Sequence, residues 1–277
     1  GNYAALPDDS SGYPWLPSQH QLRGQVIHRA VQHLVRAFKT AGWPPDNTGE
    51  AVGVLRSVGG YTKVVDNLTE KVLAEQETNP RAVPKINVLR KYLESQVPEI
   101  RRQVQRLVRS LLARQPPSAP TTQTSTGTRG RLREGTHSEE RLQSFELGWV
   151  GVADLIRIKG SDVEITDFKS GKPHETHQDQ IKAYSLLWLL DKQLNPDGIP
   201  ATSLRLAYPD HDCEISALAD TELDFLERSL RARTEQATMA AQEVPPTPRP
   251  DPDTCSKCSV RQLCEAYWSE GVNTPLV

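Results

Sequence analysis

Apolar residues recur every three or four positions along the first part of the chain, which is the spacing of an amphipathic helix. A first helix is predicted over residues 18–40, with apolar positions at Leu22, Val26, Ala30, Leu34 and Ala37. Residues 41–115 are predicted to be mostly helical, with breaks where glycine and proline fall at 42–45, 59–60 and 79–80. A first helix followed by a helical insertion is therefore expected.

The last of these helices, about residues 85–114, combines an apolar stripe with a row of arginines. The arginines are Arg101, Arg102, Arg106, Arg109 and Arg114. Two interpretations of this face stay open: a solvated helix surface, and a surface that contacts nucleic-acid phosphates.

From residue 141 onward the pattern changes to an alternation of apolar and polar residues, which is the period of a β-strand. Strands are predicted at 141–147, 152–158, 163–169 and 203–208, and helices at 176–190 and 220–241. This order predicts a mixed α/β fold, in which helices flank a central mixed sheet. Residues 115–136 are rich in proline, threonine, serine and glycine and are predicted to form a flexible loop.

The strands at 152–158 and 163–169 are joined by a turn signal at 159–162, so they are predicted to form a β-hairpin. If Lys159 faces Asp162, the same register places Asp154 opposite Asp167. Directly opposed like charges destabilise a sheet, and more so when they are buried. The hairpin therefore presses two carboxylates together on one face.

A divalent cation held by oxygen ligands is the simplest way to compensate such a pair. Lys169 lies two residues beyond Asp167 and points to the same side, where an ammonium can hold a phosphate or an attacking water. This trio suits cleavage of a phosphodiester bond. An ordinary surface hairpin is the alternative interpretation of the segment taken by itself.

The composition places few limits on function. The 277 residues carry a net charge of -2, which argues against a histone-like binder but not against local basic patches. No apolar run is long enough to span a membrane, and no signal-peptide pattern is present, so a cytoplasmic location and no membrane partner are expected. The chain begins with Gly1 instead of Met, and we expect it to be a piece of a longer polypeptide.

Three of the four cysteines have a C-x2-C-x5-C spacing, after a proline-rich stretch at 245–252: Cys255, Cys258 and Cys264. In a chain without a secretory signal, such clustering favours a metal site over disulfides. Three thiolates are one fewer than a structural zinc or an iron–sulfur cluster usually takes. The remaining Cys213 either completes the set or takes no part in it.

Together these motifs resemble the RecB-like branch of the PD-(D/E)XK nucleases. The motifs are Gly24-x-x-x-His28, Asp154, Asp167-Phe168-Lys169, Gln180-x-x-x-Tyr184 and the three cysteines, in the order of that family. The resemblance is greatest to its iron–sulfur members, the AddB and AdnB type helicase-nucleases and the CRISPR-associated RecB-like exonucleases. It covers residues 18–36 and 146–184 densely, and residues 41–135 match no known pattern.

The resemblance implies a restriction-endonuclease-like core and a set of site residues. His28, Asp154, Asp167 and the backbone carbonyl of Phe168 would bind Mg²⁺ or Mn²⁺, and Lys169 would be the catalytic lysine beside Asp154 and Asp167. Gln180 and Tyr184 would steady the site and the DNA strand. Cys255, Cys258 and Cys264 would hold a 4Fe–4S cluster, whose fourth cysteine precedes the first helix in the family and is missing here. An upstream segment is expected to supply it, and the alternatives are a three-cysteine site completed by another residue and a natural loss of the cluster.

The resemblance implies a metal-dependent DNA nuclease, acting as an exonuclease on DNA ends or single strands in DNA repair or phage defence. A helicase, fused or bound, is an expected partner. The whole chain, 1–277, would be one nuclease domain, with its core at 137–244 and a cysteine-cluster tail at 245–277. Two alternatives are a non-cleaving DNA-binding module of a helicase complex and a zinc-binding interaction domain whose hairpin is incidental.

Overall fold

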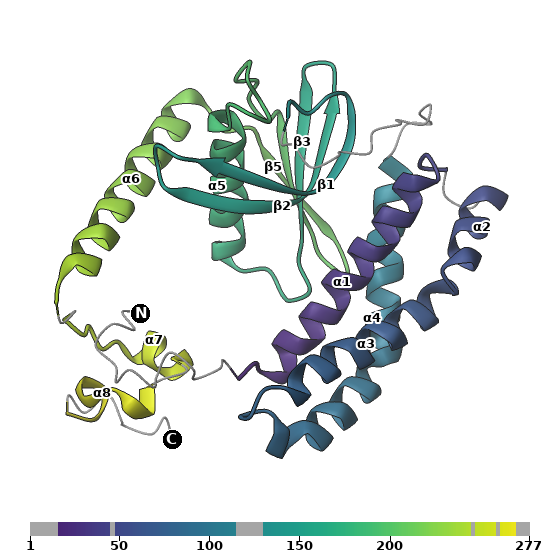
Figure 1. Ribbon diagram of the computed structural model, residues 1–277. Helices are drawn as coiled ribbons and strands as arrows, with labels where there is room; N and C mark the ends of the chain where they lie inside the picture. Colours follow the sequence, from purple (N-terminus) through teal and green to yellow (C-terminus); the bar gives the residue numbers. More distant parts are fainter. Residues whose placement is uncertain (1–15, 45–47, 115–129, 245–246, 259–260, 270–277) are drawn as a thin grey trace.

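A five-stranded sheet forms the centre of the computed structural model, which describes residues 16–44, 48–114, 130–244, 247–258 and 261–269 (Figure 1). The strands lie in the order of the chain: β1 (Gly135–Ser144), β2 (Trp149–Lys159), β3 (Asp162–Phe168), β4 (Ser203–Ala207) and β5 (Asp212–Ser216). β3 and β4 are parallel and the other pairs are antiparallel. This confirms the predicted mixed α/β fold.

The helix α5 (Glu175–Leu190) connects the two parallel strands and covers one face of the sheet. Its Ile181 and Trp188 share a buried core with Ile156, Ile165 and Leu204 from three strands. α6 (Asp220–Gln242) packs against the outer side of α5 (Figure 1). Both helices match the predicted segments.

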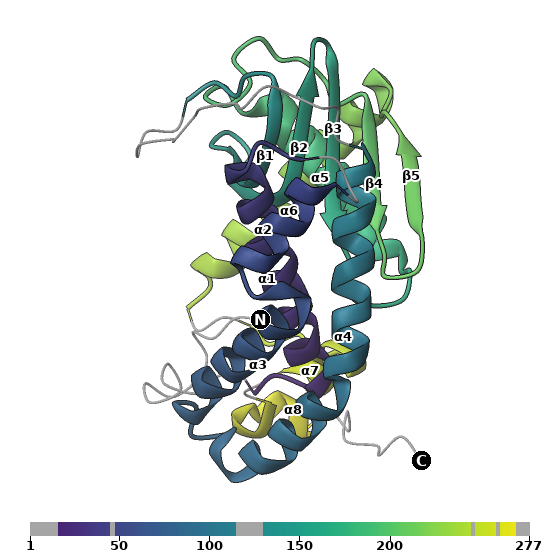
Figure 2. The same ribbon diagram turned by 90° about the vertical axis from the view of Figure 1, so that its right-hand side faces the viewer.

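The other face of the sheet is covered by a helical layer (Figure 2). Its elements are α1 (Gln19–Thr40), α2 (Gly49–Ser57), α3 (Gly60–Glu77), the short 3₁₀ helix η3 (Val83–Lys85) and α4 (Ile86–Arg114). Leu155, Phe168 and Ala207 from the sheet belong to the apolar core of this layer. The helical layer therefore covers the second face of the sheet, although its residues 41–115 match no known family pattern.

Local chemistry explains where these helices begin and end. Ser18 and Gln21 form a reciprocal capping box at the start of α1, close to where the helix was predicted to begin. The predicted breaks fall between helices, and Gly59 has a positive φ of 85° that glycine adopts without strain. One face of α1 is buried, at Leu22, Val26, Ile27, Ala30, Val31, Leu34, Val35 and Phe38.

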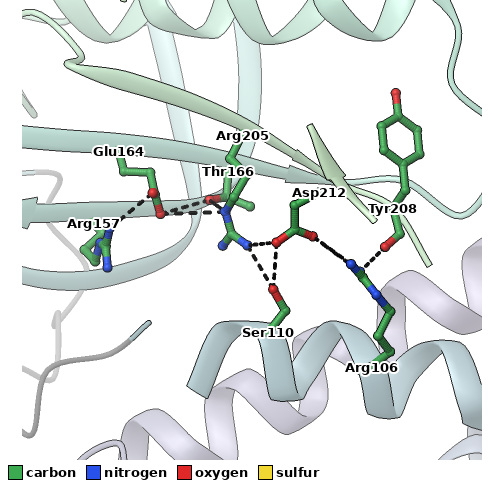
Figure 3. Close-up of polar contacts among 8 residues, drawn as sticks. All are labelled: Arg106, Ser110, Arg157, Glu164, Thr166, Arg205, Tyr208 and Asp212. Atoms are coloured by element: carbon green, nitrogen blue, oxygen red, sulfur yellow. Dashed lines mark hydrogen bonds and ion pairs between the residues drawn. The ribbon is translucent and has the colours of Figure 1, made fainter. Parts of the chain in front are cut away.

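Polar contacts fasten α4 to the sheet (Figure 3). Arg205 on β4 is only 1% exposed and bonds Thr166 on β3 and Asp212 on β5. Asp212 also accepts hydrogen bonds from Ser110 at 2.8 Å and from Arg106 at 3.2 Å, both on α4. We call this set, together with Arg157, Glu164 and the carbonyl of Tyr208, the arginine network.

The arginine face of α4 therefore divides into two parts. Arg106 turns inward to Asp212 and to the carbonyl oxygen of Tyr208, so neither interpretation of this residue was right. Arg101, Arg102 and Arg109 are exposed, and phosphate contact stays a prediction for them. The side chain of Arg114 lies outside the described residues.

One predicted strand has the wrong bounds and one strand was missed, and both lie at edges of the sheet. β1 runs from Gly135 to Ser144 instead of 141–147, and β5 was not predicted. Edge strands have a neighbour on one side only and carry polar residues, as the sequences GTHSEE and DCEIS show, so their alternation is weak. The predicted loop accordingly ends before Gly135, and its residues 115–129 lie outside the described part of the chain.

The tail after α6 contains α7 (Pro252–Lys257), the 3₁₀ helix η4 (Arg261–Leu263) and α8 (Glu265–Ser269). In both views α7 and α8 lie toward the N-terminal end of α1, away from the sheet (Figures 1 and 2). Among the described residues, no helix is both long and apolar enough to cross a membrane.

Candidate active site

The β2–β3 hairpin has the predicted register. Ile158 pairs with Val163 and Leu155 with Thr166, so the next two residues, Asp154 and Asp167, meet at the end of the ladder. Asp154 is 5% exposed and Asp167 4%. The Phe168 amide donates a hydrogen bond of 2.6 Å to Asp154 Oδ2, which closes the pair.

The two carboxylates are poorly compensated. Burial raises the pKa of Asp154 well above its ordinary value, and the charge of Asp167 raises it further, while the Phe168 amide and Lys169 lower it. Asp167 Oδ2 lies 2.6 Å from Lys169 Nζ. This ion pair aside, that buried oxygen accepts no hydrogen bond from the residues that the structure describes. The site therefore carries more negative charge than its surroundings neutralise.

Lys169 is the first member of a chain of hydrogen bonds that ends on α5. Its ammonium donates to Gln180 Oε1 at 2.6 Å, and Gln180 Nε2 donates to the Tyr184 hydroxyl at 2.6 Å. Gln180 and Tyr184 lie one helical turn apart and so share a face of α5. A Cβ at Gly151 would lie 2.6 Å from the Tyr184 ring, so glycine is needed where β2 passes this side chain. The predicted supporting residues thus hold the lysine.

His28 reaches the carboxylates from the helical layer. Its Nε2 lies 3.4 Å from Asp154 Oδ1, and its side chain is 37% exposed. A Cβ at Gly24 would be 2.9 Å from Ser170 Oγ, so a larger residue there would force the Ser170 side chain to move where α1 approaches the segment after β3. Gly24 lies one helical turn before His28, so this contact is on the side of α1 that carries the histidine.

Glu139 on β1 is a site residue that the sequence did not reveal. Its Oε1 lies 3.8 Å from His28 Nε2, and His28, Glu139 and Asp154 can place ligand atoms within 4.8 Å of one another. The register of β1 puts Glu139 opposite Asp154, where it has a strained φ of 60°. A prediction of β1 from Gly135 would have placed Glu139 here.

These residues fit a divalent metal ion. Carboxylate oxygens and an imidazole are suitable ligands for Mg²⁺ or Mn²⁺. A cation bound there would relieve the repulsion that raises the pKa of Asp154 and would add to the compensation that Lys169 gives to Asp167. Phe168 lies at the site through its amide, and the role of its carbonyl as a ligand stays a prediction.

The cysteines lie apart from this site. Cys255, Cys258 and Cys264 are half-buried free thiols in the tail, whereas Cys213 is on β5 opposite Leu206. Within the described residues, no three of them bring ligand atoms within 4.8 Å. Three thiols do not complete a cluster that takes four, so the described residues do not by themselves form this site.

A family model described as the PD-(D/E)XK nuclease superfamily matches residues 9–265, a span that contains every site residue above. The chain belongs to the PD-(D/E)XK nuclease superfamily. Membership of this superfamily implies a nuclease that uses divalent metal ions and takes DNA as its substrate. A search of curated proteins found no match. The match is to the superfamily as a whole, so the iron–sulfur branch stays a prediction.

Proposed function

We propose that the chain is a Mg²⁺- or Mn²⁺-dependent deoxyribonuclease that works as an exonuclease on DNA ends or single strands. The observation that supports this is the buried pair of Asp154 and Asp167, with Lys169 in contact with the second carboxylate. Such a pair costs stability, and active sites are where proteins keep strongly perturbed carboxylates.

His28, Asp154 and Asp167 would hold the metal ion, and Glu139 joins them as a further ligand. When bound by these residues, the ion would lower the pKa of a water molecule and neutralise the charge that develops on the phosphate. The side chains come from α1, β1, β2 and β3, so the closure of the helical layer onto the sheet fixes their separation.

Lys169 orients the reacting groups. An ammonium has three donors, of which Asp167 and Gln180 take two. The third is left for a phosphate oxygen or for the attacking water. Because Tyr184 fixes Gln180 and Gln180 fixes Lys169, the ammonium is positioned before substrate arrives, which is the condition for strong electrostatic stabilisation.

Cleavage of end-labelled DNA tests the proposal. The protein should cut with Mg²⁺ or Mn²⁺ and stop with EDTA, and Asp167→Ala should abolish cutting. The matched control is Asp162→Ala, because Asp162 is an exposed carboxylate on the same strand. Metal-dependent binding without cutting by the intact protein would instead favour the non-cleaving DNA-binding module.

The shape of the DNA substrate tests the exonuclease assignment. The protein should cleave a linear single strand and leave a circular single strand of equal sequence intact, because an exonuclease needs an end. Equal cutting of both would make the enzyme an endonuclease. A linear duplex assayed in parallel reports the strand preference.

The resemblance also predicts a 4Fe–4S cluster in the tail and a role beside a helicase in DNA repair or phage defence. Cys255, Cys258 and Cys264 would supply three ligands, and the fourth must come from outside the described residues. Iron and acid-labile sulfide, measured after anaerobic purification, test for the cluster, and bound zinc without sulfide would contradict it.

A further inference from the structure

An open groove of about 480 Å³ runs beside the active site, between α1 and the beginning of α5. Its walls include His20 and Gly24 from the first turns of α1, Lys169 and Ser170 after β3, and His177 on α5. Lys169 also lines a second hollow of about 300 Å³ that contains His28. The groove therefore begins at the catalytic lysine and leads away from the metal ligands.

His177 is held in this groove by one of its two ring nitrogens. Its Nδ1 lies 3.0 Å from the hydroxyl of Tyr208, and the two ring centroids are 5.8 Å apart. No other hydrogen bond to this imidazole comes from the residues that the structure describes. The second nitrogen, Nε2, is therefore the one left for a ligand.

Tyr208 is itself fixed on several sides. Its side chain is 2% exposed, the His211 ring stacks on it at 4.9 Å, and its amide donates to the His211 carbonyl. Figure 3 shows its carbonyl oxygen turned to Arg106 while its ring points away from the arginine network. A buried, clamped tyrosine thus sets the orientation of His177, which no proposed catalytic role uses.

The surroundings favour an anionic ligand. Lys169 and His177 both line the groove, so the lysine ammonium faces the same space as the imidazole. Arg23 donates a hydrogen bond to the Ser170 carbonyl at 3.4 Å and adds a second cation near the groove. Rings at His20 and His177 also offer surfaces on which bases of a single strand stack.

We propose that this groove holds the nucleotide next to the scissile phosphate of a DNA strand, and that His177 binds its backbone phosphate through Nε2. The ligand class is thus a single-stranded DNA segment that continues past Lys169. Tyr208 acts as a positioning residue, because it holds the imidazole and does not touch the DNA. The inference rests on the proposed nuclease function.

Steady-state cleavage of a short single strand tests the groove. His177→Ala should raise KM about tenfold, the factor that a lost hydrogen bond to a charged group represents, with kcat and the metal-concentration dependence little changed. Tyr208→Phe should raise KM by a smaller factor, and adding it to His177→Ala should change nothing more. The matched control is His33→Ala, because His33 is an exposed histidine on α1 outside the groove.

A binding measurement separates this inference from the proposed function. Fluorescence anisotropy with a labelled single strand, on Asp167→Ala protein with and without His177→Ala, needs no cleavage. A Kd about tenfold weaker with His177→Ala supports the groove even if the intact protein does not cut. If the intact protein cuts and the Kd and KM of His177→Ala equal those of His33→Ala, the inference is overturned and the nuclease stands.

Two conservative variants test the groove even if His177→Ala does not fold. His177→Gln keeps a polar side chain of similar reach, and Tyr208→Phe keeps the buried ring, so both should retain the thermal midpoint of the intact protein. A fall in kcat with unchanged KM in these two variants would also overturn the binding role.

Discussion

The sheet carries two clusters of charged residues whose compensation differs. In the arginine network, Glu164 has Arg157 at 3.1 Å and Asp212 has Arg205 at 3.1 Å, with Arg106 and Ser110 beside it. In the active site, Glu139, Asp154 and Asp167 share one lysine and one partly exposed histidine. One cluster is balanced by the protein, and the other needs a cation from outside.

The ionisation of the carboxylates reflects this difference. Burial would raise the pKa of Asp212, but the Ser110 hydroxyl and the Arg205 and Arg106 guanidinium groups lower it below its ordinary value of 3.8. Burial and a neighbouring carboxylate raise the pKa of Asp154 instead. Burial alone therefore does not indicate a functional carboxylate. A buried carboxylate whose charge is not compensated by neighbouring basic residues does.

The largest effect should come from Asp154→Asn. We expect activity to fall at least about a thousandfold, as when a group that acts directly in the transition state is lost. Unfolding without divalent metal should become no easier, because the amide keeps an oxygen for the Phe168 amide and removes a repelling charge. Single-turnover cleavage measures the activity and urea unfolding measures the stability of the variant. A large loss of stability would contradict the view that the Asp154 charge destabilises the metal-free protein.

Arg205→Met should give the opposite pattern. Removing the guanidinium leaves Asp212 and Glu164 undercompensated, so the free energy of unfolding should fall by about 3–5 kcal/mol. Arg109→Met, an exposed arginine on α4, is the control, with a change within about 0.5 kcal/mol. Urea unfolding measures both, and equal stabilities would show that the network does not hold the layer.

Glu139→Gln should have a smaller effect than loss of Asp154. Glu139 is partly exposed, at 21%, and its carboxylate lies beside His28, which can also bind the metal ion. We therefore expect the apparent metal affinity of the variant to weaken about tenfold. Cleavage rates over a series of Mn²⁺ concentrations measure this affinity. If added Mn²⁺ does not restore the rate, Glu139 serves something other than metal binding.

The smallest effect is a difference in the pH dependence of stability. A lowered folded pKa makes Asp212 stabilising above its unfolded value of 3.8, and that stability is lost as the pH falls through the lowered pKa. A raised folded pKa makes Asp154 costly as the pH rises from 3.8 through the raised pKa in metal-free protein. Urea unfolding from pH 3 to 8 measures both effects. Asp212→Asn should reduce the loss of unfolding free energy toward low pH, and Asp154→Asn should reduce its loss as the pH rises above 3.8.

The hairpin and its carboxylates could be predicted because a short turn and a period of two fix a register. The same rule failed for Glu139, since the polar edge strand β1 gives little alternation. The alternation rule also failed to predict the arginine network. Arg205 alternates with the leucines of SLRLA, so the pattern suggests that it faces solvent. That side of β4 instead faces α4, and only the packing of a distant helix onto the sheet shows it.

The Arg23–Ser170 contact joins residues 147 positions apart, and the Arg106–Tyr208 contact spans 102. Closing such long loops is slow because the entropy is lost before the contacts form. His28 is synthesised before the strands that complete its site. A nascent chain that ends before β3 lacks Asp167 and Lys169, so the second carboxylate and the lysine of the site are both absent until the sheet is made.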